Sequence, residues 1–225
     1  MKHLFPRAVS ATLALLALCG AAQAQTAGSW SVRVNVTRLI PQTRSGDLSA
    51  PSFPHTRVNV GADTQLTGGI TYMLTDNWAL DLPVGMPFKP VIYGAGAIAG
   101  VGRLDQTKVA PVALMAQYRF GQAQAAFRPF VGLGVVYSKF FKNRSTAALS
   151  GVTGGSPDNP TTASIDNRFG LMPQVGLVWN FNGRWFLNAS YYKSFLKTTA
   201  HLSTGQHIPI RLNPDVFTLG VGYQF

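Results

Sequence analysis

The chain has 225 residues, of which 46% are hydrophobic and 12% charged, about half the charged fraction of an ordinary soluble domain. Its 19 Lys and Arg residues outnumber eight acidic residues, all of them Asp, and the net charge is +11. Because Glu is a strong helix former that soluble helices use on exposed faces, its absence argues against an extensively helical soluble fold. With one Cys, the chain can form neither an internal disulfide nor a thiolate metal cluster.

Residues 1–24 have the pattern of a secretory signal peptide. Lys2 and Arg7 precede a short apolar run, and Ala22-Gln23-Ala24 is a small-x-small cleavage site. The run is shorter than the roughly 20 residues of a membrane-spanning helix, which disfavours the alternative of an uncleaved N-terminal anchor. We therefore predict a cleaved signal peptide at 1–24 and an exported domain at 25–225.

Eight segments after residue 29 alternate apolar residues with small or polar ones. In the first, Trp30, Val32 and Val34 are separated by Ser31 and Arg33. A period of two over about ten residues is typical of a β-strand between two unlike environments. An even number of such strands favours an antiparallel sheet closed on itself. The segments are 30–37, 66–74, 78–84, 112–120, 129–140, 168–181, 185–193 and 216–225.

The connections between these segments alternate strictly in length. Short ones, at 75–77, 121–128 and 182–184, are interleaved with long ones at about 41–63, 85–108, 141–167 and 194–214. This is the layout of an outer-membrane barrel with short periplasmic turns and long extracellular loops. A soluble β-sandwich has no reason to segregate loop length by side. We predict an all-β fold, an eight-stranded antiparallel transmembrane β-barrel with three short periplasmic turns and four longer extracellular loops, in the bacterial outer membrane.

Aromatic residues gather where the predicted strands meet the short turns. Amphipathic rings prefer the boundary between membrane and water, so we interpret these residues as a periplasmic aromatic girdle. The last strand ends in a C-terminal Phe, which is similar to the signal that the outer-membrane assembly machinery reads. The girdle residues are Trp30, Trp78, Tyr118, Phe120, Trp179, Phe181, Trp185, Tyr223 and Phe225.

Several ordered motifs carry a family resemblance over essentially the whole predicted mature chain. They are Leu66–Tyr72, Asp76–Asp81, Pro87–Lys89, Gln117–Phe120, Arg128–Gly132, Trp185–Ser190, Thr198–Ala200 and Gly220–Phe225. With these motifs the chain resembles the OmpW family of eight-stranded outer-membrane proteins. The resemblance implies a narrow channel that passes small hydrophobic molecules. One position departs from the family pattern, because Pro90 follows Pro-Phe-Lys where the family usually has a His.

The face of the predicted strands that points inward carries large apolar residues. An eight-stranded barrel is just wide enough inside for side chains or one small ligand, and flexible Met side chains yield around an apolar solute. These residues are therefore candidate channel-lining positions, with a stabilising plug as the alternative. They are Met73, Met115, Phe130, Val136, Met172, Val178, Phe186 and Tyr192.

Two prolines lie near the outer ends of the third and fourth strands. Pro83 and Pro111 flank the Gly-rich loop 85–108, in strands that we expect to be hydrogen-bonded neighbours. Because proline cannot donate to the ladder, we hypothesise a weak seam that opens laterally into the bilayer. Two ordinary strand-end prolines are the alternative.

Most of the basic residues lie on the side of the long loops. Nucleic acid is not a routine partner of an exported barrel, so we expect none. Outward-facing cations suit the phosphates of lipopolysaccharide, and solvated loops without a ligand are the alternative. The candidates are Lys89, Lys139, Lys142, Arg144, Lys193 and Lys197.

Nothing in the sequence fixes the geometry of an enzyme site. The histidines of the predicted mature chain, His55, His201 and His207, all fall in long loops, and no base is placed beside a nucleophile. The segment 94–99 matches a loose dinucleotide-binding pattern but lacks the helix that must follow it. We predict no enzymatic activity, cofactor or metal site.

Two functions follow from these observations. The first is passive uptake of small hydrophobic solutes through a narrow channel, with a possible lateral exit into the bilayer. The second is a plugged barrel that serves as a surface receptor or as a structural, stress-related protein of the outer membrane.

Overall fold

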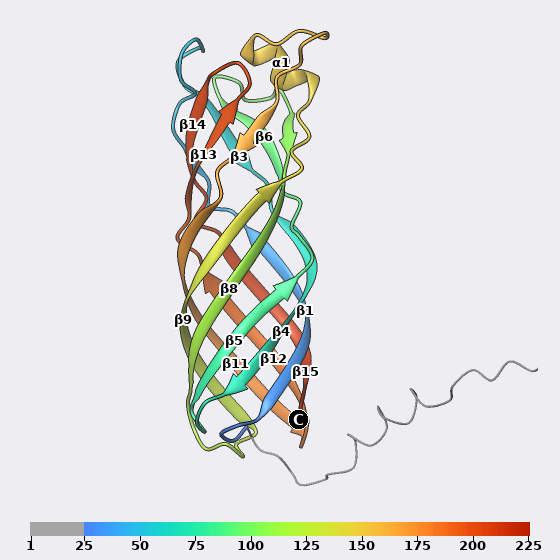
Figure 1. Cartoon of the computed structure of the whole chain (residues 1–225), viewed down its shortest axis with the longest axis vertical. Helices are drawn as coiled ribbons and strands as arrows, with labels where there is room; N and C mark the ends of the chain where they lie inside the picture. Colours follow the sequence, from blue (N-terminus) through green and yellow to red (C-terminus); the bar gives the residue numbers. More distant parts are fainter. Residues whose placement is uncertain (1–24) are drawn as a thin grey trace, which may run out of the picture.

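Eight strands close into an antiparallel barrel whose wall the alternating pattern predicts. The computed structural model describes residues 25–225, so the signal peptide expected at 1–24 lies outside the described residues. The barrel strands are β1 (Trp30–Ile40), β4 (Asp63–Met73), β5 (Trp78–Gly85), β8 (Lys108–Arg119), β9 (Phe127–Phe141), β11 (Arg168–Asn182), β12 (Trp185–Lys193) and β15 (Asp215–Gln224). Each is paired with its neighbour in sequence, and β1 closes the wall against β15 (Figure 1).

The two faces of the wall differ as the pattern requires. On β1, Val34 is 62% exposed whereas Arg33 and Asn35 are 6% and 3% exposed. The apolar face therefore points away from the barrel, where lipid rather than water is its solvent. No helix in residues 25–225 has the length and hydropathy needed to cross a membrane.

The long loops are ordered, which the sequence analysis did not predict. Together they form what we call the extracellular cap, residues 41–62, 86–107, 142–167 and 194–214, at the end of the barrel opposite the short turns (Figure 1). The cap contains two small sheets, in the orders β10-β13-β14-β2 and β3-β6-β7. Its elements are β2 (Arg44–Ser45), β3 (Thr56–Val60), β6 (Val91–Gly96), β7 (Arg103–Gln106), β10 (Ala163–Ile165), β13 (Lys197–Leu202), β14 (His207–Arg211) and α1 (Ala147–Thr153).

The Gly-rich segment 94–99, expected in an irregular loop, forms the end of β6 and the turn that follows it. Gly96 has a positive φ of 63°, a conformation that glycine adopts without steric cost. A side chain at Gly96 would also overlap the carbonyl oxygen of His55 on the adjacent β3 hairpin. Gly96 therefore serves a tight turn of the cap.

Candidate functional site

The outer half of the barrel encloses a cavity of about 130 Å³, which we call the lumen cavity. Side chains from every barrel strand line it, and cap residues such as Phe88, Ile92 and Leu196 cover it. The volume approaches the roughly 150 Å³ of an apolar cavity that is known to bind benzene. The cavity therefore suits one aromatic ring or a short hydrocarbon chain.

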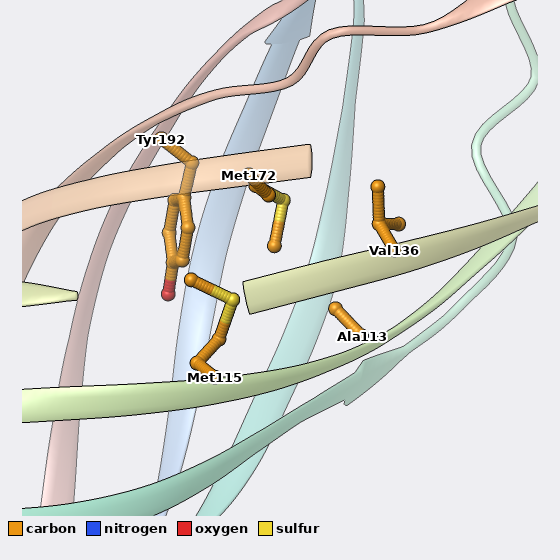
Figure 2. Packing of buried hydrophobic residues seen from close by; sticks show 5 residues of the cluster. All are labelled: Ala113, Met115, Val136, Met172 and Tyr192. Carbon is orange, nitrogen blue, oxygen red and sulfur yellow. The ribbon is translucent and has the colours of Figure 1, made fainter. Parts of the chain in front are cut away.

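One wall of the lumen cavity is apolar. Ala113, Met115, Val136, Met172 and Tyr192 form a buried cluster there. Figure 2 shows Met115, Met172 and Tyr192 turned toward one another inside the barrel, with Val136 and Ala113 beside them. The two Met side chains give this wall the flexibility to adjust to solutes of different shape.

The opposite wall is polar, and its hydroxyl groups are bonded to one another. Thr37 Oγ1 lies 2.6 Å from Thr67 Oγ1 and 3.0 Å from Thr218 Oγ1. Next to them Asn35 lines the cavity, 3% exposed, and its Oδ1 has no hydrogen-bond partner. Because this oxygen lies against Gly220, where any side chain would overlap it, the polar wall is closely packed.

A buried ion pair forms the floor of the lumen cavity. The Arg33 guanidinium donates to both carboxylate oxygens of Asp81, at 2.6 and 2.7 Å. Thr71 Oγ1 donates to Asp81 Oδ1 at 2.6 Å and accepts from Arg33 Nη1 at 2.9 Å. Because any side chain at position 69 would overlap the guanidinium, Gly69 makes room for this pair. Bidentate pairing of this kind is strong and fixes geometry.

Below the floor, side chains fill the barrel down to the short turns. Phe130, Val178 and Phe186 form a buried cluster. Around it lies a polar network in which Gln117 Nε2 donates to Gln174 Oε1 at 3.0 Å and Arg119 donates to Gln25 Oε1 at 2.5 Å. We call these residues, together with Arg128, the periplasmic plug. The lumen cavity therefore ends at the Arg33–Asp81 pair.

The eight candidate channel residues are all buried, but they lie at different depths in the barrel. Val136, Met172 and Tyr192 line the lumen cavity, and Met115 packs against them. Phe130, Val178 and Phe186 belong to the periplasmic plug. Met73 is the last residue of β4, next to a short turn. Sequence reasoning missed the ion pair at the floor, although the inward positions of Arg33 and Asp81 in the alternating pattern were a visible signal.

The hydrogen-bond ladder of the barrel wall is interrupted at the seam between β5 and β8, and we call this interruption the gap. The register pairing between these strands covers only Trp78 to Asp81, opposite Tyr118 to Met115, whereas every other seam has at least seven pairs. Above the gap, Phe88 and Val109 exchange two backbone hydrogen bonds, at 2.9 and 2.8 Å. On one edge of the gap, Phe88 lies seven residues after Asp81. On the other edge, Met115 lies only six residues after Val109. The two edges are therefore out of register.

Pro83 and Pro111 lie on the two edges of this gap and line the lumen cavity. They were expected in hydrogen-bonded neighbouring strands, but the β5–β8 ladder stops before it reaches them. On their other sides, Pro83 faces Gly69 and Pro111 faces Ser138 in intact ladders. Val84 also lines the lumen cavity and is 45% exposed on the barrel surface. At this seam a single residue, Val84, therefore contacts both the lumen cavity and the outer surface of the barrel.

The nine girdle candidates lie at the ends of the strands next to the short turns, and their rings contact one another in chains. Examples are Trp78 with Tyr118 and Tyr118 with Phe120, at centroid distances of 5.2 and 5.1 Å. Contacts of the same kind join the rest, with Tyr72 and Phe127 as additional members: Trp30–Tyr72, Phe127–Trp179, Trp179–Phe181, Trp185–Tyr223 and Tyr223–Phe225. Near the cap, Tyr137–Phe169 and Tyr191–Phe217 are further ring pairs that the sequence analysis missed.

Five of the six basic candidates are exposed, and one is paired. Lys89, Lys139, Lys142, Arg144 and Lys197 are exposed near or within the cap. Lys193 Nζ instead lies 2.7 Å from Asp215 Oδ1, which also accepts from Tyr191 Oη. The positive charge of Lys193 is therefore largely compensated within the protein.

The loop histidines lie in the cap, where His55 Nδ1 is 3.5 Å from Asp47 Oδ2. His201 and His207 face each other across β13 and β14 with ring centroids 6.3 Å apart, and His201 Nε2 is 3.5 Å from Asp166. Within residues 25–225 no three His, Cys, Asp or Glu side chains group so as to hold a metal ion.

A closed eight-stranded wall with an apolar outer face, an aromatic girdle and long loops at one end defines a small β-barrel of the bacterial outer membrane. The model of the OmpW family matches residues 26–225, and the chain belongs to this family. It is 34% identical over 232 residues to outer membrane protein W of Escherichia coli K12, covering 100% of both chains. The crystal structure of the outer membrane protein OprG from Pseudomonas aeruginosa superimposes with a TM-score of 0.80 at 25% identity, covering 90% of this chain and 99% of that one.

A more distant relative has an informative name. The dibenzothiophene metabolism operon protein DoxH of Pseudomonas sp. strain C18 is 24% identical over 200 residues, covering 87% of this chain and 88% of the relative.

Proposed function

We propose that this protein is a passive channel for small, uncharged, largely apolar solutes, which enter the lumen cavity from the cap and leave through the gap between β5 and β8. The observation that carries the proposal is the continuity of the lumen cavity with the only short seam of the described barrel. A lateral exit suits this architecture because the periplasmic plug occupies the straight path to the periplasm.

The chemistry of the cavity supports this solute class. An apolar wall faces a wall whose hydroxyl groups already bond to one another, so an uncharged ring or chain displaces little bound water. A relative named for an operon of dibenzothiophene metabolism fits the same class, since dibenzothiophene is an apolar aromatic compound. An ion that entered this cavity would lose its hydration shell, and the cavity offers no groups that replace it.

Uptake tests the proposal in vesicles whose outer leaflet is lipopolysaccharide, because phospholipid alone is permeable to apolar solutes. The probe is N-phenyl-1-naphthylamine, whose fluorescence rises when it enters hydrocarbon. We expect the protein to accelerate its entry and to give no ion conductance in single-channel recordings. An unchanged entry rate would reject the channel.

The gap is tested by giving both of its edges hydrogen-bond donors. The double substitution Pro83→Val and Pro111→Val allows the β5–β8 ladder to extend, so we expect slower uptake. Pro173→Val is the matched control, since Pro173 faces Leu133 in an intact seam. Equal rates for the double variant, the control and the unaltered protein would contradict a lateral exit.

The periplasmic plug favours a second candidate, a closed barrel that acts as a surface receptor or structural protein. The buried network of Gln117, Gln174 and Arg119 is the observation behind it. An unchanged entry rate of N-phenyl-1-naphthylamine, together with no conductance in single-channel recordings, would support this function instead.

Two partners besides lipid belong to the proposal. The exposed cations Lys89, Lys139, Lys142, Arg144 and Lys197 suit the phosphates of lipopolysaccharide. The C-terminal Phe225, which directly follows the final strand β15, suits recognition by the outer-membrane assembly machinery.

A further inference from the structure

The extracellular cap contains a second cavity, of about 50 Å³, which we call the cap cavity. Its walls come from two hydrophobic clusters, one around Leu48 and Ile208 and the other around Ile98 and Leu104. Protein interiors leave few voids larger than a water molecule. A void with mostly aliphatic walls between two clusters therefore differs from a core that serves packing alone.

Three residues line both the cap cavity and the lumen cavity, and all three are isoleucines. They are Ile92, Ile165 and Ile210. They lie on β6, β10 and β14, so each comes from a different extracellular loop. Ile92 and Ile210 are 7% and 4% exposed. A thin aliphatic wall therefore separates the two cavities.

We propose that the cap cavity is an entry site for small uncharged apolar molecules, and that Ile92, Ile165 and Ile210 form the barrier that such a molecule crosses to reach the lumen cavity. This inference rests on the proposed channel function and adds to it a second binding site and a residue-level barrier. A hydrocarbon loses no hydrogen bonds between aliphatic side chains, whereas water, an ion or a sugar does.

Asp105 restricts the chemical class further. It lines the cap cavity, is 2% exposed, and forms no ion pair among the described residues. An anionic solute such as a fatty-acid carboxylate would meet this acidic group in a site of low dielectric constant. The site therefore favours neutral solutes over carboxylates.

The first test changes the two cavities separately. Ala200 lines the cap cavity and not the lumen cavity, so Ala200→Leu fills the former alone. We expect it to slow uptake of N-phenyl-1-naphthylamine at least fivefold. Ala99→Leu is the matched control, because Ala99 is exposed in a turn of the same cap. Ile92→Ala, Ile165→Ala and Ile210→Ala should each accelerate uptake at least twofold, and a heat-dependent gel shift reports whether each variant is folded.

The second test detects binding directly, whether or not transport is seen. Toluene is titrated into methyl-labelled protein in lipid nanodiscs. We expect it to shift the methyl resonances of Ala200 and Ile208, which line only the cap cavity, as well as that of Met172, which lines only the lumen cavity. Shifts at Met172 alone, with unaltered uptake by Ala200→Leu, would overturn the entry site while leaving the channel function intact. Shifts at Ala200 and Ile208 in a protein that fails to transport would reject the channel but retain the site.

Discussion

At the scale of single residues, the Arg33–Asp81 pair is a bidentate ion pair buried in the barrel interior. Both side chains are almost completely buried, at 4% and 0% exposed, and Thr71 bonds to each of them. Each of these buried charges is stabilised by the other, because neither has a second partner of opposite charge among its hydrogen bonds.

We predict that Arg33→Met or Asp81→Leu alone lowers the free energy of unfolding by about 3–5 kcal/mol, because each leaves an unpaired buried charge. The double substitution should recover most of this loss. Urea unfolding in lipid vesicles, followed by tryptophan fluorescence, measures the three variants. Additive losses in the double variant would show that the pair is not coupled.

Asp105 in the cap is almost completely buried and forms no ion pair among the described residues. Burial raises its pKa above the ordinary value of 3.8, while the amides of Gln106 and Arg144, the Ser145 hydroxyl and the nearby Arg103 partly oppose this. The raised pKa favours the protonated form of Asp105 in the folded cap. The contribution of Asp105 to cap stability is therefore complete below pH 3.8 and is lost as the pH rises through the folded pKa.

Asp105→Asn should therefore make cap stability nearly independent of pH above 3.8. In the unaltered protein, hydrogen-exchange protection of cap amides, corrected for intrinsic rates, should fall as the pH rises toward neutrality. At pH 7 the variant should be protected several-fold better. Identical profiles for the two proteins would mean that Asp105 is as well solvated in the cap as in the unfolded chain.

The residue scale also shows how far sequence reasoning reached. The period-two pattern places Arg33 and Asp81 on the inner face, but their pairing depends on the register between β1, β4 and β5, which the pattern does not contain. For the same reason, the pattern could not divide the inward apolar residues between the lumen cavity and the periplasmic plug. Their depth in the barrel depends on strand stagger.

At the scale of elements, the eight barrel strands were predictable and the cap was not. Long strands between lipid and lumen need sustained alternation, and the predicted segments fall within a few residues of the observed strands. The cap strands have two to six residues, too few for a period to emerge, and they pair across different loops. Pro83 and Pro111 lie at the seam whose ladder is shortest, and a weak, laterally opening seam there stays a prediction.

Phe88 lies at the upper end of the gap. Its backbone bonds to Val109, and its ring, 3% exposed, lines the lumen cavity. Phe88→Ala should therefore enlarge both the cavity and the exit, and we expect uptake of two-ring solutes to rise more than uptake of single-ring ones. Phe140→Ala is the matched control, since Phe140 lines the cavity beside the intact β8–β9 seam.

The measurement is the ratio of uptake rates for the two solute sizes in the same vesicle preparation. A large-to-small aromatic substitution at a buried site costs about 3–5 kcal/mol, so folded protein must be quantified by gel shift for both variants. Equal ratios for Phe88→Ala and Phe140→Ala would indicate that cavity volume alone, and not the gap, limits the size of the solute.

At the scale of the whole molecule, charge is distributed along the barrel axis. The exposed cations that we propose as lipopolysaccharide ligands lie toward the cap, whereas Arg119 and Arg128 near the short turns are buried in the periplasmic plug. The excess of Lys and Arg in the sequence is therefore divided between two locations, the exposed surface near the cap and the interior of the barrel, and net charge alone could not separate them.

Lys139, Lys142 and Arg144 provide the final test, because they are exposed and follow one another across the end of β9. A cation near an anionic lipid surface contributes on the order of 1 kcal/mol, so replacing all three with Gln should weaken lipopolysaccharide binding by roughly ten- to a hundredfold. Lys193→Gln should have a smaller effect, since Asp215 already compensates that charge. Binding is measured with the barrel in detergent at several salt concentrations, and screening should reduce the difference between the proteins as salt rises. If the triple variant binds as tightly as the unaltered protein at low salt, the cap cations are merely solvated.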